Sequence, residues 1–186
     1  MGRCWQVNMA KNRLVIKSPN ALEDIRKAIG KNAISVGIHA DTGNHDGSKE
    51  QVTVAQIYWW MEFGFHHAKG NFSVLPRPTL RPTFISNKAK YFKAMENIAK
   101  AVMEGNANKS GKGARTGKRG NMIGKANVRQ LMGRLGQVVE ADVKNAIVSL
   151  RTPPNAESTI KQKGSSNPLI DTGQMVNEVR WEFVKK

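Results

Sequence analysis

Apolar and polar residues alternate in three short segments of the chain, and this two-residue period is typical of half-buried strands. The first segment predicts a hairpin over residues 4–18, with an extended arm over residues 1–18 that reaches a neighbouring subunit as the alternative. The other two segments cover residues 34–38 and 179–183. Because each of these has one apolar face to bury, we expect the two strands to pair.

Four further segments repeat their apolar residues at the spacing of an amphipathic helix. They cover residues 20–30, 52–63, 82–104 and 128–150. The first begins with Asn20 and Glu23 at capping-box spacing. The apolar stripe predicted for the third consists of Ile85, Phe92, Met95, Ile98 and Val102. In the fourth, Gly133 and Gly136 each lower helix stability by about 1 kcal/mol relative to Ala, and we expect them to permit close packing.

These elements predict an α+β fold, in which a small mixed or antiparallel sheet packs against two long helices and long irregular loops connect the parts. The 186 residues suit a single domain, 1–186, with a flexible basic insertion at 105–125 and an interaction loop at 151–173. Hydrophobic residues make up 39%, which is adequate for a modest core but low for a globular chain. Part of the chain is therefore expected to pack only against a partner.

Prolines stiffen two of the connecting segments. Residues 65–81 are expected to be irregular and end in LPRPTLRP, where each proline restricts the residue before it to extended conformations. Residues 152–173 open with two prolines, continue through a polar stretch rich in Gly and Ser, and return to apolar residues at 168–170. Because loops of this length are usually functional or disordered, these apolar anchors favour a function.

The helix predicted over residues 52–63 carries three consecutive aromatic residues, Tyr58, Trp59 and Trp60. One short helix face cannot bury all three side chains. Two of them are expected in the core, and the third in a contact with another subunit.

The charge of the chain is strongly unbalanced, with 30 Lys and Arg against 14 Asp and Glu, or +16 formally. Such an excess attracts nucleic acid, anionic membranes or acidic protein surfaces. No apolar run approaches the ~18 residues of a membrane span, and the N-terminus lacks the apolar region of a signal peptide, so we expect a cytoplasmic protein. The single cysteine, Cys4, excludes an internal disulfide.

Residues 105–125 combine Gly, Ser and Lys, have almost nothing to bury and are expected to be mobile. No acidic residue occurs between Glu104 and Glu140. The segment is either a solvated linker or a loop that neutralises backbone phosphates without reading sequence. The cations expected to face DNA are Lys109, Lys112, Arg115, Lys118, Arg119 and Lys125.

The motifs that suggest catalysis or metal binding are all incomplete. The tripeptide 171–173 matches the aspartic protease motif, but that reaction needs a second carboxylate and no second copy occurs. Residues 113–118 are one residue short of a phosphate-binding loop, and Arg119 replaces the hydroxyl residue that holds magnesium. His39, His45, His66 and His67 offer no i, i+4 helical pair for zinc. The sequence therefore predicts a protein that is not an enzyme and holds no cofactor or metal.

Two segments carry motifs that occur together. The C-terminal one reads Pro-Pro-Asn, a Ser-Thr pair, Lys-Gly and Pro-Leu-Ile-Asp-Thr-Gly over residues 153–173. The upstream one contains Val-Ala-Gln-Ile, Met-Glu-Phe-Gly, Leu-Pro-Arg-Pro and Arg-Pro over residues 54–82. In order and spacing they resemble the neck and tail-completion proteins of tailed bacteriophages, across roughly the last two thirds of the chain. The N-terminal stretch and the basic segment around Lys112 do not match that pattern.

The resemblance implies a structural virion protein of the head–tail junction that is assembled in the host cytoplasm. It implies a ring around the DNA path, with a hexamer expected because six copies match the symmetry of the tail. The implied partners are further copies of the chain, the head connector or adaptor, tail terminator or tail tube proteins, and double-stranded DNA bound non-specifically. The residues expected at subunit or partner contacts are Trp59, Trp60, Glu62, Gly64, Pro76, Arg77, Pro78, Arg81, Pro153, Pro154, Asn155, Lys163, Gly164, Pro168, Leu169, Ile170, Asp171, Thr172 and Gly173.

Within such a ring, Glu62 and Gly64 are expected to end a helix that positions the proline-rich element. Arg77 and Arg81 are expected either to pair with carboxylates of an adjacent subunit or to cap helix carbonyls. Lys163 is expected to meet an acidic partner surface.

Three other functions remain open. A tail terminator that caps the tail tube belongs to the same class of virion proteins. A free sequence-independent DNA-binding protein is supported by charge alone and predicts tight, salt-dependent binding by the monomer. A small nuclease or endopeptidase would need clustered acidic or His residues, whereas the 14 acids of this chain are scattered.

Overall fold

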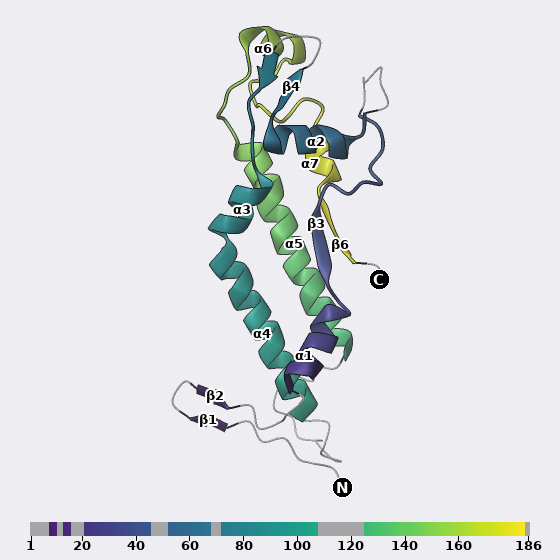
Figure 1. Ribbon diagram of the computed structural model, residues 1–186, viewed down its shortest axis with the longest axis vertical. Coiled ribbons are helices and arrows are strands. Elements are labelled where there is room, and N and C mark those ends of the chain that lie inside the picture. The colour runs from purple at the N-terminus through teal and green to yellow at the C-terminus, as the bar shows by residue number, and fades with distance from the viewer. Residues whose placement is uncertain are drawn as a thin grey trace. The chain divides into compact units, whose positions relative to one another are not determined.

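The computed structural model describes residues 8–10, 13–15, 21–45, 52–67, 72–107 and 125–184, and these form a mixed helix and strand fold (Figure 1). In chain order the elements are β1 Asn8–Ala10, β2 Arg13–Val15, α1 Ala21–Gly30, β3 Ile34–Gly37, α2 Val54–Phe63, β4 Phe65–His67, β5 Phe72–Val74, α3 Leu80–Ser86, α4 Lys88–Ala107, α5 Lys125–Ser149, α6 Glu157–Lys163, α7 Gln174–Glu178 and β6 Arg180–Phe183. No helix among these described residues is long and apolar enough to cross a membrane.

Of the hairpin predicted over residues 4–18, the structure describes the two paired strands, and the other residues of that segment lie outside the described ones. Strand β1 pairs with β2 in antiparallel fashion, with Met9 opposite Leu14. The helix predicted next is confirmed as α1, whose exposed Lys27 and Glu23 form an i, i+4 ion pair at 2.8 Å. Asn20, the other half of the predicted capping box, lies outside the described residues, as does Cys4.

The chain divides into two compact units. Unit 1 consists of residues Met1–Ile34, Ala89–Leu135 and Phe183–Lys186, and unit 2 of Ser35–Lys88 and Gly136–Glu182. In unit 1 the buried apolar side chains recur at helical spacing along α4 and the first part of α5. They are Tyr91, Ile98, Val102, Val128, Met132 and Leu135.

Unit 2 has its own core, which draws on segments far apart in the sequence. Tyr58 of α2 packs with Val143 and Ile147 of α5, with Leu169 of the loop before α7, and with Val179 before β6. Val143 and Ile147 are four residues apart and therefore share a helix face. The second part of α5 is thus the element on which α2 and the C-terminal segment meet.

The single helix predicted over residues 82–104 is wrong in its start and in its continuity. Helix α3 begins at Leu80, and Asn87 separates it from α4. The Asn87 side chain and backbone N–H both donate to the Thr83 carbonyl oxygen at 3.0 Å. Two positions of the predicted stripe, Ile85 and Phe92, are 74% and 64% exposed, and Tyr91 is buried in place of Phe92 on the helix face that it shares with Ile98 and Val102.

The pairing predicted for the strands at 34–38 and 179–183 is confirmed, since β3 and β6 are hydrogen-bonded. The described strands nevertheless form separate two-stranded sheets, β1–β2, β3–β6 and β4–β5, instead of one small sheet. The last of these was not expected, because residues 65–81 were predicted to be irregular. The hairpin fits there because the prolines of this segment begin only after β5, with Phe65 opposite Val74.

Two short helices lie in the C-terminal region that was predicted as a loop and turn. Helix α6 ends at Gly164, which has the left-handed conformation (φ 69°) and donates its N–H to the Ile160 carbonyl oxygen at 2.8 Å. Helix α7 follows Gly173, whose φ is 83°. The sequence predicts a loop at Gly164 and a turn at Gly173, whereas in the structure each glycine lies at a helix end.

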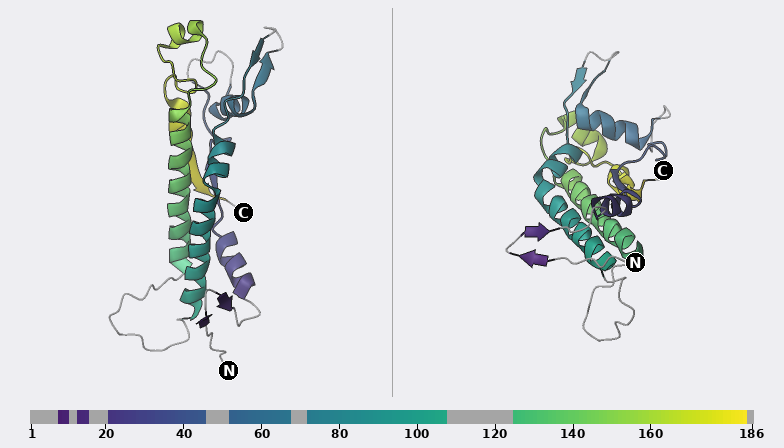
Figure 2. Two further views of the ribbon diagram at one scale, coloured as in Figure 1. Left: turned by 90° about the vertical axis from the view of Figure 1, so that its left-hand side faces the viewer. Right: turned by 60° about the horizontal axis from the view of Figure 1, so that its bottom comes forward.

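Helix α5 runs without a break through 25 residues, as both views in Figure 2 show for the green ribbon. The close packing predicted at its glycines is confirmed at Gly136, where an added Cβ would lie 2.6 Å from the Trp181 indole. One turn away, Glu140 accepts the Trp181 backbone N–H at 3.1 Å and pairs with Lys144 at 2.7 Å. Strand β6 is therefore fixed against α5 by packing and by a carboxylate.

Candidate functional site

Helix α2 supports the region in which the recognisable motifs lie. Its start is fixed by a complete capping box, in which the Thr53 hydroxyl accepts the Gln56 N–H at 3.2 Å and the Gln56 side chain accepts the Thr53 N–H at 2.9 Å. Its end is fixed at Gly64, whose N–H donates to the Trp60 carbonyl oxygen at 2.7 Å. The helix is therefore held at both ends.

Glu62 lies in the last turn of α2, but its carboxylate caps another helix. The side chain is buried, with 4% exposed, and accepts the backbone N–H groups of Thr79 at 2.7 Å, Leu80 at 3.1 Å and Arg81 at 3.0 Å. Thr79 is the N-cap residue of α3 and makes no side-chain capping bond of its own. A negative charge at this position satisfies the free N–H groups and interacts favourably with the helix dipole.

Tyr58 reinforces the same junction from one turn earlier in α2. Its hydroxyl lies 2.9 Å from the Thr79 hydroxyl in a buried position. Burial, with a smaller contribution from the Glu62 charge, raises the pKa of Tyr58 to about 12, although the hydrogen bond to Thr79 acts in the opposite direction. The phenol therefore stays protonated and the junction contains one buried charge, that of Glu62.

Gly64 allows the proline-rich segment to lie directly against the end of α2. Its φ is 74°, and an added Cβ would lie 2.9 Å from the Val74 carbonyl oxygen and 3.0 Å from Pro76. A side chain here would be strained by both the backbone conformation and the contact. The glycine is therefore required by the approach of residues 74–76.

Arg77 joins the two segments whose motifs occur together in the sequence. Its backbone N–H donates to the Met61 carbonyl oxygen at 2.6 Å. Its guanidinium donates to the carbonyl oxygens of Pro153 and Pro154, each at 3.2 Å. Burial lowers the pKa of Arg77, but an arginine remains charged. The proline-rich element and the C-terminal loop are thus joined by hydrogen bonds within unit 2.

Lys163 holds the C-terminal loop closed. Its ammonium group donates to the carbonyl oxygens of Asn167 at 2.7 Å and Ile170 at 2.8 Å. Burial lowers the pKa of Lys163, and Arg77 adds to this effect, while the charge of Asp171 opposes it. The ammonium that was expected to meet an acidic partner is therefore engaged by carbonyl oxygens of its own loop.

Asn167 is the centre of this closed loop, and sequence analysis did not single it out. Its side-chain oxygen accepts the N–H groups of Leu169 at 3.0 Å and Ile170 at 3.2 Å, and its amide donates to the Val148 carbonyl oxygen at 2.8 Å. Its own carbonyl oxygen accepts the Asn155 amide at 3.2 Å. An asparagine just before a proline in a Ser-rich segment is a turn signal that could have been noted.

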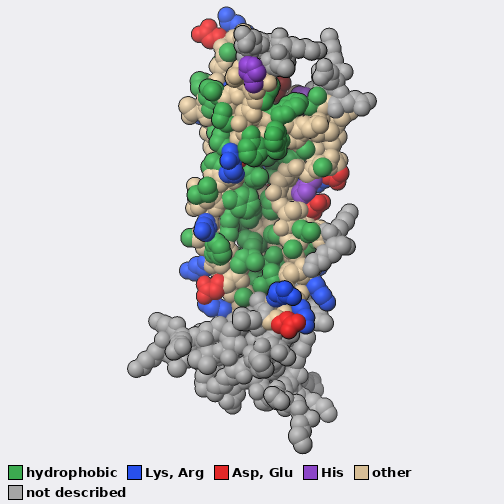
Figure 3. Space-filling model, viewed as in Figure 1, with side chains coloured by type: hydrophobic (Ala, Val, Ile, Leu, Met, Phe, Trp, Pro, Cys, Tyr) green, Lys and Arg blue, Asp and Glu red, His purple; other side chains and the backbone are tan. Residues whose placement is uncertain are grey.

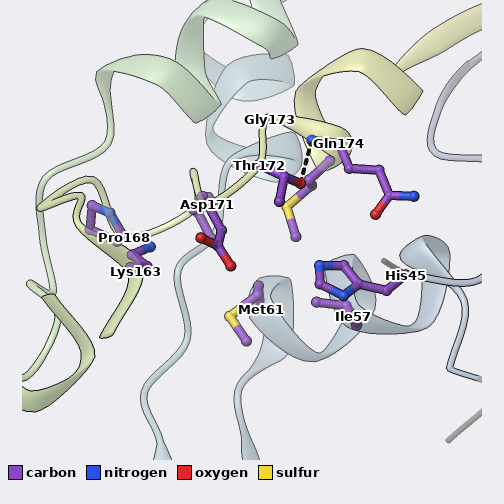
Figure 4. Close-up of a pocket in the computed structure, with 11 residues that line it drawn as sticks. His45, Ile57, Met61, Lys163, Pro168, Asp171, Thr172, Gly173 and Gln174 are labelled. Atoms are coloured by element: carbon purple, nitrogen blue, oxygen red, sulfur yellow. Dashed lines mark hydrogen bonds between the residues drawn. The ribbon is translucent and has the colours of Figure 1, made fainter. Parts of the chain in front are cut away.

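A pocket of about 130 Å³ opens beside this loop (Figure 4). Its lining consists of His45, Ile57, Met61, Lys163, Pro168, Leu169, Asp171, Thr172, Gly173, Gln174 and Met175. In Figure 4 the Asp171 side chain extends toward Met61, and the Thr172 hydroxyl accepts the Gln174 N–H at 3.4 Å. Asp171 is the sole acidic residue in this described lining, so the pocket lacks the paired carboxylates of an aspartic protease.

A second polar group, at strands β3 and β6, contains a Ser, a His and a Glu. Both the Ser35 hydroxyl, at 2.9 Å, and the Glu182 carboxylate, at 3.3 Å, approach the same nitrogen of His39, Nε2. The other nitrogen, Nδ1, is buried without a hydrogen-bond partner among the described residues. A catalytic triad needs the acid and the hydroxyl on different nitrogens, so this group cannot relay a proton.

The predicted contact residues all fall within unit 2, and several are used inside the chain. Pro168 and Leu169 are buried, whereas Asp171 and Thr172 are exposed. Of the three consecutive aromatic residues, Tyr58 is buried and Trp60 is half-buried, with its ring centroid 5.5 Å from that of Phe65. Trp59 is exposed.

The predicted DNA-facing cations are mostly beyond what the structure describes. Lys109, Lys112, Arg115, Lys118 and Arg119 lie outside the described residues, and Lys125 is the first residue of α5. No group of three or more potential metal ligands occurs in the described part of the chain.

Comparison of the chain with protein-family models, with curated proteins and with solved structures finds no match. A function is therefore inferred from the contacts within unit 2 and from the distribution of charge along the chain.

Proposed function

We propose that this chain is a structural, non-enzymatic virion protein of the head–tail junction of a tailed bacteriophage, in the manner of a neck or tail-completion protein. The observation that carries the proposal is the bond between the two motif-bearing segments. Arg77 of the upstream segment donates to Pro153 and Pro154 of the downstream segment, 76 and 77 residues away. Motifs that occur together in the sequence and contact each other in the structure are expected to serve one function.

The role of this part is mechanical. Glu62 fixes the start of α3, Gly64 lets the prolines approach α2, and Lys163 closes the C-terminal loop. Loops held in this way present a fixed surface to a neighbour at little entropic cost. In the proposed assembly this rigid group, together with the β3–β6 ladder on α5, forms the framework of each subunit of a ring.

The distribution of charge supports a DNA path through the lumen of that ring. Unit 1 contains 20 Lys and Arg against 4 Asp and Glu, whereas unit 2 contains 10 of each. The whole formal charge of +16 therefore belongs to unit 1. Cations concentrated in this way neutralise phosphates independently of sequence. We propose that unit 1 faces double-stranded DNA, and that unit 2 contacts other proteins of the junction.

The test is the solution mass and shape of the purified protein, alone and with isolated tail tubes, by analytical ultracentrifugation and electron microscopy. The proposal predicts closed rings, with a hexamer expected, or tubes capped at one end. A protein that stays monomeric at high concentration and ignores tail tubes would contradict it.

A further inference from the structure

Exposed aromatic and aliphatic side chains gather on α2 and α3 in unit 2. Figure 3 shows hydrophobic side chains, in green, on the surface over these two helices. On α2, Trp59 is 59% exposed and Phe63 is 50% exposed. Phe84 and Ile85 of α3 are also exposed. Large apolar side chains grouped in this way mark interaction sites more often than single ones do.

The side chains are arranged in an ordered way. The ring centroids of Trp59 and Phe63 are 5.1 Å apart with the planes tilted by 40°. The Arg81 guanidinium lies 4.6 Å from the Phe63 ring centroid, a cation–π contact. Arg81 lies three and four residues before Phe84 and Ile85, so these three positions share a face of α3. We call Trp59, Phe63, Arg81, Phe84 and Ile85 the aromatic face.

The aromatic face is fixed in place before any partner arrives. The Arg81 guanidinium donates to the Glu62 carboxylate and to the Glu62 carbonyl oxygen, both at 3.4 Å. The same carboxylate holds the start of α3, so α2 and α3 present their side chains as one surface. Trp and Arg are enriched among residues that dominate binding energy, and a preformed surface loses little entropy on binding.

We propose that the aromatic face is where one copy of this chain binds unit 2 of a second copy. A ring needs a contact between copies, and the charge distribution favours unit 2 over unit 1 for that contact. Two copies that met through unit 1 would bring +16 against +16, whereas unit 2 carries equal numbers of acidic and basic residues. Unit 2 has no net formal charge, so two copies of the chain can contact each other through unit 2 without net electrostatic repulsion. This inference rests on the proposed ring, and it assigns the contact to α2 and α3 instead of the proline loops.

The experiment compares two double variants of the full chain by sedimentation velocity over a range of concentrations. Trp59→Ser with Ile85→Ser removes two exposed side chains of the aromatic face. Leu75→Ser with Val148→Ser is the matched control, because both residues are exposed, apolar and in unit 2 but outside α2 and α3. The face variant should raise the concentration needed for half-assembly by about tenfold or more. The control should assemble as the wild type does.

Circular dichroism and denaturation experiments check that both variants fold as the wild type does. We expect them to fold because the substituted side chains are exposed. The inference is overturned if a folded face variant assembles normally, or if the control loses assembly equally. A wild-type protein that never assembles would overturn the ring together with this contact. Wild-type rings that survive the face variant would overturn the contact alone.

Discussion

The two units of this chain use charged residues in opposite ways. In unit 1 the described ion pairs are local, such as Lys27 with Glu23 and Lys100 with Glu96, each one helical turn apart. In unit 2 charged side chains join distant segments, as Glu62 does for α3 and Arg77 for the C-terminal loop. Surface pairs contribute little to stability, whereas buried hydrogen-bonded charges fix tertiary structure. The comparison teaches that charged side chains shape the tertiary structure of unit 2, whereas the ion pairs described in unit 1 join residues of the same helix.

Removal of the Glu62 carboxylate should have the largest effect on stability. Glu62→Ala leaves the N–H groups of Thr79, Leu80 and Arg81 without their acceptor, the first in a buried and the other two in part-buried positions. We expect a loss of about 3–5 kcal/mol in the free energy of unfolding, measured by urea denaturation. The control is Glu96→Ala in unit 1, which removes an exposed local pair and should leave the transition unchanged. Equal behaviour of the two variants would remove the distinction between the units.

Alkaline pH should weaken the same junction through Tyr58. Its pKa rises from 10.0 to about 12 on folding, so its contribution is fully present below pH 10 and is lost as the pH rises through 12. The full loss corresponds to about 3 kcal/mol. Tyr58→Phe should start from a lower stability at neutral pH but show a shallower decline in this window. Parallel declines in denaturation series at pH 9 to 12 would show that the phenol is not the titrating group.

Gly136→Ala should destabilise unit 2 although alanine favours helices. The new Cβ would lie 2.6 Å from the Trp181 ring. Overpacking of this kind costs about 1–3 kcal/mol, against a gain of up to about 1 kcal/mol in helix propensity. In a Trp181→Ala background the same change should be neutral or stabilising, and a double-mutant cycle measures the difference. If Gly136→Ala changes the stability equally with and without Trp181, the glycine is not required by the packing of the Trp181 indole.

The smallest expected effect separates the units by their affinity for DNA. Lys93 of α4 in unit 1 and Lys161 of α6 in unit 2 are both exposed, so Lys93→Glu and Lys161→Glu change the charge equally at the surface. If Lys93 contacts a phosphate, its variant should reduce the slope of log affinity against log salt by about 0.9. Lys161→Glu should leave the slope unchanged. Identical slopes for both variants would mean that the affinity for DNA depends on the net charge of the chain and not on which unit carries the charge.

The parts of the structure that depend on local sequence could be predicted. The alternating segments at 34–38 and 179–183 do pair, and α1, α2 and α5 follow the apolar period. The need for a small residue at Gly136 was also visible, because glycines inside an amphipathic helix lack another reason to be there. Local propensity and periodicity are properties of neighbouring residues, so the sequence displays them directly.

The contacts that build the site could not be predicted, because they join residues far apart in the chain. Nothing near Glu62 indicates that it caps a helix 17 residues later, and nothing near Arg77 indicates that its acceptors are at 153 and 154. The early start of α3 follows from that remote cap. The resemblance drew attention to Glu62 and Arg77, but their partners within the chain required the structure.

Cryo-electron microscopy of the purified protein mixed with a short DNA duplex tests the central claim most directly, since it locates both units in one measurement. We predict a closed ring in which α2 and α3 of each copy contact unit 2 of the next copy, with duplex density against unit 1. A monomer, or a ring whose copies meet through unit 1 with no DNA in the lumen, would contradict the account.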